Sequence, residues 1–180
     1  MNYLNKHNIL SNSQFGFHPG LNTFDAITKF TSYLYSALDD HKSIISIFID
    51  FSKAFETVHH NILLDKLQHY CIRGCVHKWF RSYLSNRFQY TLLNKATSST
   101  KPIHLGVPQG SILGSILFLL YINDMSSFST SLNTIQFADD STLYMQGNNP
   151  TDLIHKANSE LVKFSEWCLA NRLNVNTTKT

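Results

Sequence analysis

Two adjacent carboxylates, Asp139 and Asp140, stand between two short runs of alternating apolar and polar residues, 134–137 and 141–145. Alternation on both sides of a tight turn is typical of a β-hairpin. The sequence therefore predicts a hairpin that carries two acids at its tip. Like charges repel, so the pair has either of two explanations. It binds a divalent cation, or it is an ordinary turn in which aspartate bonds its own backbone.

A third carboxylate, Asp50, ends the β-branched apolar run 43–49, which reads as a buried strand. An ionised carboxylate at the end of such a strand is costly unless a cation or hydrogen bonds compensate it. Two interpretations stay open on spacing alone. Asp50 either caps a helix that begins at Phe51, or joins Asp139 and Asp140 around Mg²⁺.

Composition limits the class of protein. The chain has 180 residues, of which 43% are apolar and 13% aromatic, enough for the core of one domain or slightly more. The net charge of +3 permits a nucleic-acid partner without indicating one. The most apolar stretch, 112–122, is interrupted by Gly114 and Ser115 and is too short to cross a bilayer, so we expect a soluble protein with no membrane partner.

Cysteine usage bears on location. Three cysteines, an odd number, argue against the disulfide framework of a secreted protein. The N-terminus has no apolar signal core. We therefore expect an intracellular protein.

The order of the expected elements indicates the fold class. Helical spacing of apolar residues predicts helices over about 22–38, 63–71, 76–83 and 150–170, and a glycine-rich loop at 106–110 leads into an apolar helix. Strands are expected at 43–49 and 89–93 and in the hairpin. Helices and strands do not alternate strictly, which favours an α+β fold over a doubly wound sheet.

Five short motifs follow one another along residues 11–180. In chain order they are Gln14-Phe15-Gly16-Phe17, Ile49-Asp50-Phe51-Ser52-Lys53-Ala54-Phe55, Gly106-Val107-Pro108-Gln109-Gly110-Ser111, Phe137-Ala138-Asp139-Asp140, and a last group made of Trp167, Asn171, Leu173, Asn174 and Lys179-Thr180. Together the five resemble the reverse transcriptases of non-LTR (LINE-type) retrotransposons. The order of the motifs is more specific than any one of them.

The resemblance implies a palm-and-fingers polymerase fold, with an antiparallel palm sheet and helices packed on one of its faces. It implies fingers elements at about 1–42 and 60–100 and a palm at about 43–59 and 101–180. The thumb and endonuclease of that family would lie outside residues 1–180. The implied activity is RNA-directed DNA synthesis, with an RNA template, a DNA primer and deoxynucleoside triphosphates as partners, in the nucleus or cytoplasm.

The resemblance also implies roles for the acids. Asp50 and Asp139 would be the principal ligands of two Mg²⁺ ions, which Mn²⁺ can replace, with Asp140 beside them. Two such ions stabilise the attacking and leaving oxygens of a phosphoryl transfer. Lys179 matches the lysine that protonates the leaving pyrophosphate.

Four further residues would contact the nucleotide. Phe55 resembles the aromatic steric gate that excludes a ribose 2′-hydroxyl, and its plainer interpretation is a core aromatic. Gln109 and Gly110 resemble the loop beside the incoming nucleotide, where a bare backbone permits close approach. His18 stands where the family usually has an arginine that holds the triphosphate, and histidine cannot grip phosphate with two parallel donors.

Two more departures are Glu56, where aspartate is usual, and Ser115, where proline is common. None of the three departures removes a metal ligand. Two alternatives stay open. The first is a catalytically inactive remnant or nucleic-acid-binding module that keeps the fold. The second is another palm polymerase, such as an RNA-dependent RNA polymerase or an intron-encoded enzyme.

Overall fold

The computed structural model describes residues 1–108 and 110–180, which form two compact units. Unit 1 consists of Met1–Ala54 and Ile122–Thr180, and unit 2 consists of Phe55–Tyr121. Asp50, Asp139 and Asp140 all belong to unit 1, so their arrangement is set within one folded body.

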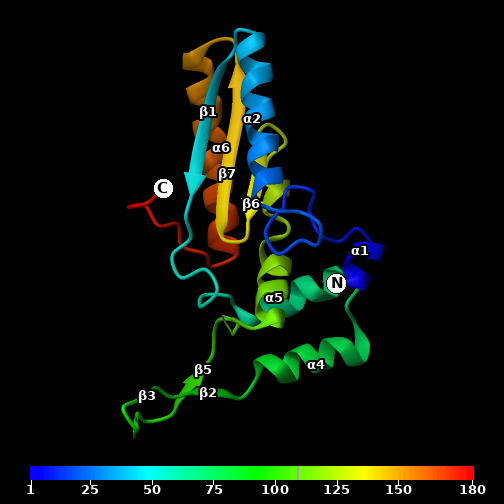
Figure 1. Ribbon diagram of the computed structural model, residues 1–180, viewed down its shortest axis with the longest axis vertical. Coiled ribbons are helices and arrows are strands. Elements are labelled where there is room, and N and C mark those ends of the chain that lie inside the picture. Colours follow the sequence, from blue (N-terminus) through cyan, green and yellow to red (C-terminus); the bar gives the residue numbers. More distant parts are fainter. Residues whose placement is uncertain (109) are drawn as a thin grey trace. The chain divides into compact units, whose positions relative to one another are not determined.

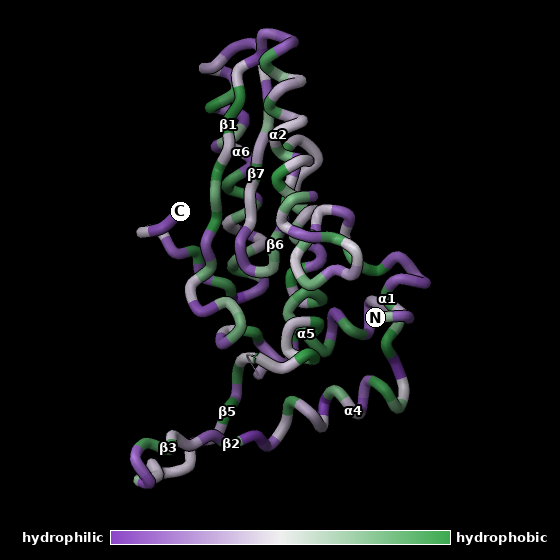
Figure 2. Tube along the Cα trace, in the orientation of Figure 1, coloured by the Kyte–Doolittle hydropathy of each residue, from purple (hydrophilic) through white to green (hydrophobic). Residues whose placement is uncertain are grey.

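The centre of unit 1 is a three-stranded antiparallel sheet (Figure 1). Its strands are β1 (Ser43–Ile49), β7 (Asp140–Gly147) and β6 (Asn133–Phe137), with β7 in the middle. Figure 2 shows β1 as a largely hydrophobic strand. The expectation of a buried strand is wrong for most of β1, because it lies at the edge of the sheet: only Ile49 is buried, and Phe48 is 60% exposed. Leu143 on β7 is fully buried.

Helix α2 (Thr23–Asp39) covers one face of this sheet. It begins in a capping box, in which the Asn22 side chain accepts hydrogen bonds from the helix and Asp25 reaches back to the Asn22 backbone. Its aromatic residues Phe30 and Tyr33 meet the ring of Tyr144 edge-on, at centroid distances of 5.3 and 4.7 Å.

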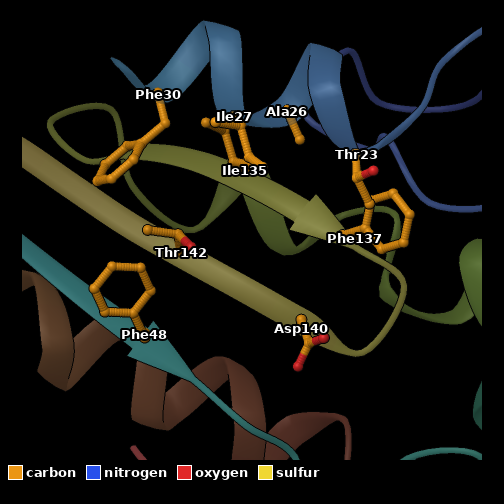
Figure 3. A pocket seen from close by; sticks show the side chains of 9 residues that line it. All are labelled: Thr23, Ala26, Ile27, Phe30, Phe48, Ile135, Phe137, Asp140 and Thr142. Atoms are coloured by element: carbon orange, nitrogen blue, oxygen red, sulfur yellow. The ribbon is translucent and has the colours of Figure 1, made fainter. Parts of the chain in front are cut away.

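Helix α6 (Pro150–Ala170) packs against β1 and β7 on the opposite side of the strands from α2 (Figure 3). Pro150 occupies the first helical position. The side chain of the preceding residue, Asn149, caps the helix by accepting a hydrogen bond from the Thr151 amide. The antiparallel palm sheet is confirmed, but one expected detail is wrong, because helices lie on both faces. Strand side chains alternate, and both faces of β7 carry large apolar residues that need cover.

Shorter elements complete unit 1. They are α1 (Asn2–Lys6) and a 3₁₀ helix, η1 (Met125–Ser127). The Asn123 side chain joins the N-terminal region to this part, donating to the Ile9 carbonyl and accepting from the Ser11 amide, each at 2.7 Å.

Unit 2 is built on α3 (His60–His69), α4 (Gly74–Leu84) and α5 (Ile112–Ile122), whose last residue belongs to unit 1. It also has two short antiparallel pairs, β2 (Arg87–Gln89) with β5 (Lys101–Ile103) and β3 (Leu92–Leu93) with β4 (Ala96–Thr97). Buried His77 ties α4 to α3, since its Nε2 donates to the Leu64 carbonyl at 3.1 Å. As predicted, α5 is a core helix, with residues 117–122 almost fully buried.

The expected helices and hairpin are confirmed with small shifts of their ends, while the strand expected at 89–93 is two shorter strands. Among the described residues, no helix has both the length and the apolar character needed to cross a membrane.

Candidate active site

The hairpin between β6 and β7 has a two-residue loop, Ala138 and Asp139, between the paired residues Phe137 and Asp140. Asp139 therefore lies at the tip and Asp140 begins the central strand, as the alternation predicted. Ala138 has a φ of +58°, a conformation that costs a non-glycine residue about 1 kcal/mol. The surroundings must hold the turn in this shape.

Gln14 holds the turn. Its side chain is 1% exposed, and its Oε1 accepts hydrogen bonds from the Ala138 amide at 3.1 Å and the Gly16 amide at 2.9 Å. The backbone beside it pairs with β6, through Phe15 N–H to Gln136 O and Gln136 N–H to Ser13 O, each at 2.8 Å.

Gly16 is required by the same contact. A Cβ at this position would lie 2.3 Å from the Ala138 nitrogen, closer than any real contact of that kind. The motif at residues 14–17 thus buttresses the acid-bearing turn, a role that the sequence did not reveal.

The register of β1 against β7 places Asp50. Ile49 pairs with Ser141, so the next position along brings Asp50 beside Asp140. Directly opposite residues of an antiparallel pair point to the same face. Residues 51–59 form turns and α3 begins only at His60, so Asp50 caps no helix and that interpretation is wrong.

The C-terminal segment fixes the Asp50 side chain. Asn176 donates from Nδ2 to Asp50 Oδ2 at 2.8 Å, and its amide donates to the Asp50 carbonyl at 2.8 Å. Ser52 N–H donates to Asn174 O in the same stretch, also at 2.8 Å. The sequence gave no sign that Asn176 would orient a carboxylate.

Lys179 lies close to the same carboxylate, with its Nζ 3.9 Å from Asp50 Oδ2. Its side chain is 69% exposed and that of Asp50 is 28% exposed. An ion pair this exposed contributes little to stability. The contact matters because it places the Lys179 amine close to Asp50.

The three carboxylates share one electrostatic environment. Loss of hydration raises the pKa of Asp140, the charges of Asp139 and Asp50 raise it further, and Lys179 lowers it. Within residues 1–108 and 110–180, no three His, Cys, Asp or Glu side chains form a ready-made metal cage. Mg²⁺ needs no such cage, because it binds through one or two carboxylates and completes its shell with water and substrate phosphates.

An apolar cavity of about 290 Å³ lies beside Asp140, between α2 and the sheet (Figure 3). Its walls are Thr23, Ala26, Ile27, Phe30, Phe48, Ile135, Phe137, Asp140 and Thr142. Aromatic neighbours limit the hydration of a carboxylate, which accounts for the leading cause of the raised pKa of Asp140.

Among the described residues, two of the predicted nucleotide contacts, Phe55 and Gly110, belong to unit 2. The Phe55 ring stacks on Phe118 at a centroid distance of 4.3 Å, which fixes its orientation. Its carbonyl accepts from the Val107 amide at 2.9 Å, so the loop at 106–110 is tied to the chain after Asp50. Gly106 has a φ of +84°, and a Cβ there would lie 2.7 Å from the Glu56 carbonyl oxygen.

The remaining predicted residues are placed as follows. Gly110 has a φ of +79°, which favours glycine. Gln109 lies outside the described residues. His18, in unit 1, is half-exposed, and its Nδ1 lies 3.1 Å from the Pro19 carbonyl oxygen.

The family model for "Reverse transcriptase (RNA-dependent DNA polymerase)" matches residues 1–180. The chain belongs to the reverse transcriptase family. The resemblance stated from its motifs is therefore confirmed at the level of the family.

Relatives of this reverse transcriptase domain include RNA-directed DNA polymerases of Drosophila melanogaster mobile elements. The probable enzyme from transposon BS is 27% identical over 179 residues, covering 96% of this chain and 20% of the relative. The probable enzyme from transposon X-element is 29% identical, covering 93% and 19%, and that of mobile element jockey is 24% identical, covering 92% and 19%. The chain thus spans about a fifth of the length of these relatives.

Solved structures agree on the fold. Telomerase from Candida tropicalis, in complex with a fragment of telomeric RNA, superposes with a TM-score of 0.73 at 13% identity, over 99% of this chain and 32% of that one. Telomerase from Candida albicans gives 0.68 at 13% identity, over the same shares. At this level of identity the likeness shows the palm fold alone.

Gln14→Ala tests the buttress. The substitution removes the acceptor of two buried amides, so we expect the free energy of unfolding to fall by about 2–4 kcal/mol. Amide hydrogen exchange in the peptide that covers 137–140 should become faster. Gln68→Ala, at an exposed glutamine, is the matched control and should change stability by less than about 0.5 kcal/mol. Unchanged exchange at the hairpin in Gln14→Ala would show that the turn holds itself.

Asp140→Asn tests the shared charge. Folding raises the pKa of the Asp140 carboxyl, so the folded state holds its proton more tightly than the unfolded state does. The free energy of unfolding therefore falls as the pH rises through the folded-state pKa. Without metal, Asp140→Asn should therefore be more stable than wild type at about pH 7, by up to about 1 kcal/mol, and equal to it at about pH 3. Urea denaturation measures both, with Glu166→Gln as the exposed control. A loss of stability at neutral pH would contradict the repulsion.

Proposed function

We propose that this chain is the fingers–palm portion of an RNA-directed DNA polymerase and transfers deoxynucleotides to a primer 3′-hydroxyl on an RNA template. The observation that carries the proposal is the pairing of β1 with β7, which brings Asp50 beside Asp140 at the base of the turn that holds Asp139. Membership of the reverse transcriptase family supports the reaction class.

The donor set suits a hard divalent cation. Asp50, Asp139 and Asp140 offer carboxylate oxygens, the ligands that Mg²⁺ prefers, and Asp140 feels the uncompensated charges of the other two. We propose two Mg²⁺ ions at these residues, with Mn²⁺ as a possible replacement. When bound, such ions lower the pKa of the attacking hydroxyl and neutralise charge on the leaving pyrophosphate.

The residues around Asp50 have separate tasks. Asn176 fixes one oxygen of Asp50 through its 2.8 Å hydrogen bond, which leaves the other oxygen for a ligand. Lys179, with its Nζ 3.9 Å from Asp50 Oδ2, would give a proton to the departing pyrophosphate.

We propose that residues of unit 2, together with His18, contact the incoming nucleotide. The ring of Phe55, held by Phe118, would act as the steric gate against a 2′-hydroxyl. Gln109 and Gly110 would form the loop beside the incoming nucleotide. His18 would hold the triphosphate less firmly than an arginine, since it cannot form a bidentate pair.

Primer extension tests the reaction. We expect the chain, with an annealed RNA template and DNA primer, deoxynucleotides and Mg²⁺, to extend the primer. Asp139→Asn should reduce the rate at least about a hundredfold, because an interaction worth several kcal/mol in the transition state is lost. Asp39→Asn, at an exposed acid on α2, should keep the wild-type rate. If the folded wild-type chain shows no extension, the inactive nucleic-acid-binding module becomes the better account.

The same assay with ribonucleotides tests the choice of sugar. Phe55→Ala removes the proposed gate, so ribonucleotide use should rise relative to deoxynucleotide use. Wild-type preference for ribonucleotides would instead indicate an RNA polymerase of the palm class, and an unchanged ratio in Phe55→Ala would reject the gate.

A further inference from the structure

Charge is distributed unequally between the two units. Unit 2 has seven Lys and Arg residues and only two acids, Glu56 and Asp65, a net charge of +5 with histidine neutral. Unit 1 has eight basic residues against ten acids. The modest net charge of the whole chain therefore conceals a strongly basic body of 67 residues, the electrostatic condition for binding a phosphate backbone.

Helix α4 presents an aromatic ladder on the surface of unit 2. The rings of Trp79 and Tyr83, one helical turn apart, stack at a centroid distance of 5.6 Å and an angle of 15°. The Arg87 guanidinium lies over the Tyr83 ring at 5.1 Å. Tyr83 thus stacks with Trp79 and contacts the cation of Arg87.

The core does not account for this ladder. The buried side of α4 is formed by His77 and Leu84, which are 6% and 1% exposed. Trp79 is 54% exposed, although an indole of this size normally buries most of its surface. Basic residues accompany the aromatics, with Lys78 and Arg81 also exposed, and Figure 2 shows hydrophilic colour recurring along α4.

The ladder continues toward the loop that precedes α5. Arg87 also lines a hollow of about 520 Å³ together with Phe88, Gly106 and Pro108. Glu56 contributes the acidic side chain of this hollow. A nucleic-acid strand that lies along Trp79, Tyr83 and Arg87 would therefore run toward the loop at 106–108.

We propose that this face of α4 binds single-stranded RNA, with a base stacked on Trp79 and the backbone held by the basic residues of unit 2. Stacking platforms beside cationic side chains are the common means of holding single strands without reading their sequence. The choice of RNA over DNA rests on the proposed function, in which the template is RNA. That α4 binds a single strand at all is inferred from the aromatic ladder and from the positive net charge of unit 2.

The test is fluorescence anisotropy of the full chain with a labelled, unpaired RNA oligonucleotide in EDTA, so that no metal contributes. Trp79→Leu keeps apolar bulk but removes the stacking face, and we expect it to weaken binding about fivefold or more. Trp79→Phe keeps a ring and should bind more tightly than Trp79→Leu. Tyr35→Leu, at an exposed tyrosine on α2, should bind like wild type.

Two further readouts distinguish stacking from a structural effect. RNA should quench tryptophan emission in wild type but not in Trp79→Phe, which leaves Trp167 as the remaining indole. Lys78→Gln should weaken binding, most strongly at low salt, and reduce the dependence of log K on log salt by about 1. Equal RNA affinity in wild type and Trp79→Leu would overturn the proposal, and tighter binding of the matching DNA strand would overturn RNA as the occupant.

The outcomes separate this surface from the catalytic proposal. Asp139→Asn should bind the oligonucleotide like wild type in EDTA, even though it should not extend a primer. If wild type fails in primer extension while Trp79→Leu still weakens RNA binding, the surface stands and the proposed reaction fails. If extension succeeds while Trp79→Leu binds normally, the reverse holds.

Discussion

The antiparallel pairing of β1 with β7 is the interaction on which the rest of the site depends. These strands are distant in sequence, and each ends at an acid. Their register, with Ile49 opposite Ser141, brings the two ends together. A slip of one residue would turn Asp50 to the other face of the sheet. The apolar side chains on both faces of the central strand β7 oppose such a slip, because α2 and α6 bury Tyr144 on one face and Leu143 and Met145 on the other. The packing that fixes the register of the strands therefore also fixes the positions of the acids.

Hydrogen bonds made by two buried or half-buried amide side chains fix the strand ends that carry the acids. The hairpin turn adopts an unfavourable conformation at Ala138, and the buried Gln14 amide holds it there. On the other strand, Asn176 holds Asp50 by a side-chain and a backbone hydrogen bond. Each acid-bearing end is thus fixed by a neutral amide from a remote part of the chain. Neutral partners orient carboxylates without cancelling the charge that a divalent cation would need.

Much of this arrangement could be predicted from the sequence, and the exceptions have a common cause. Period-two alternation identified the hairpin, and the apolar run identified β1, because these signals are local. The roles of Gln14 and Asn176 could not be predicted, since each depends on a contact over more than a hundred positions. The placement of α2 on the second face of the sheet was missed for the same reason. An amphipathic helix shows which of its sides is buried, but not which face of a sheet receives it.

The central claim is that strand pairing gathers three acids from two parts of the chain into one site for divalent cations. Iron(II) can stand in for Mg²⁺ at such sites, and with ascorbate and peroxide it cleaves nearby backbone. The account predicts cuts at two separate places, near Asp50 and near Asp139, both suppressed by excess Mg²⁺ and both lost in Asp139→Asn. Cleavage at only one of the two places, or at both in Asp139→Asn, would contradict a shared site.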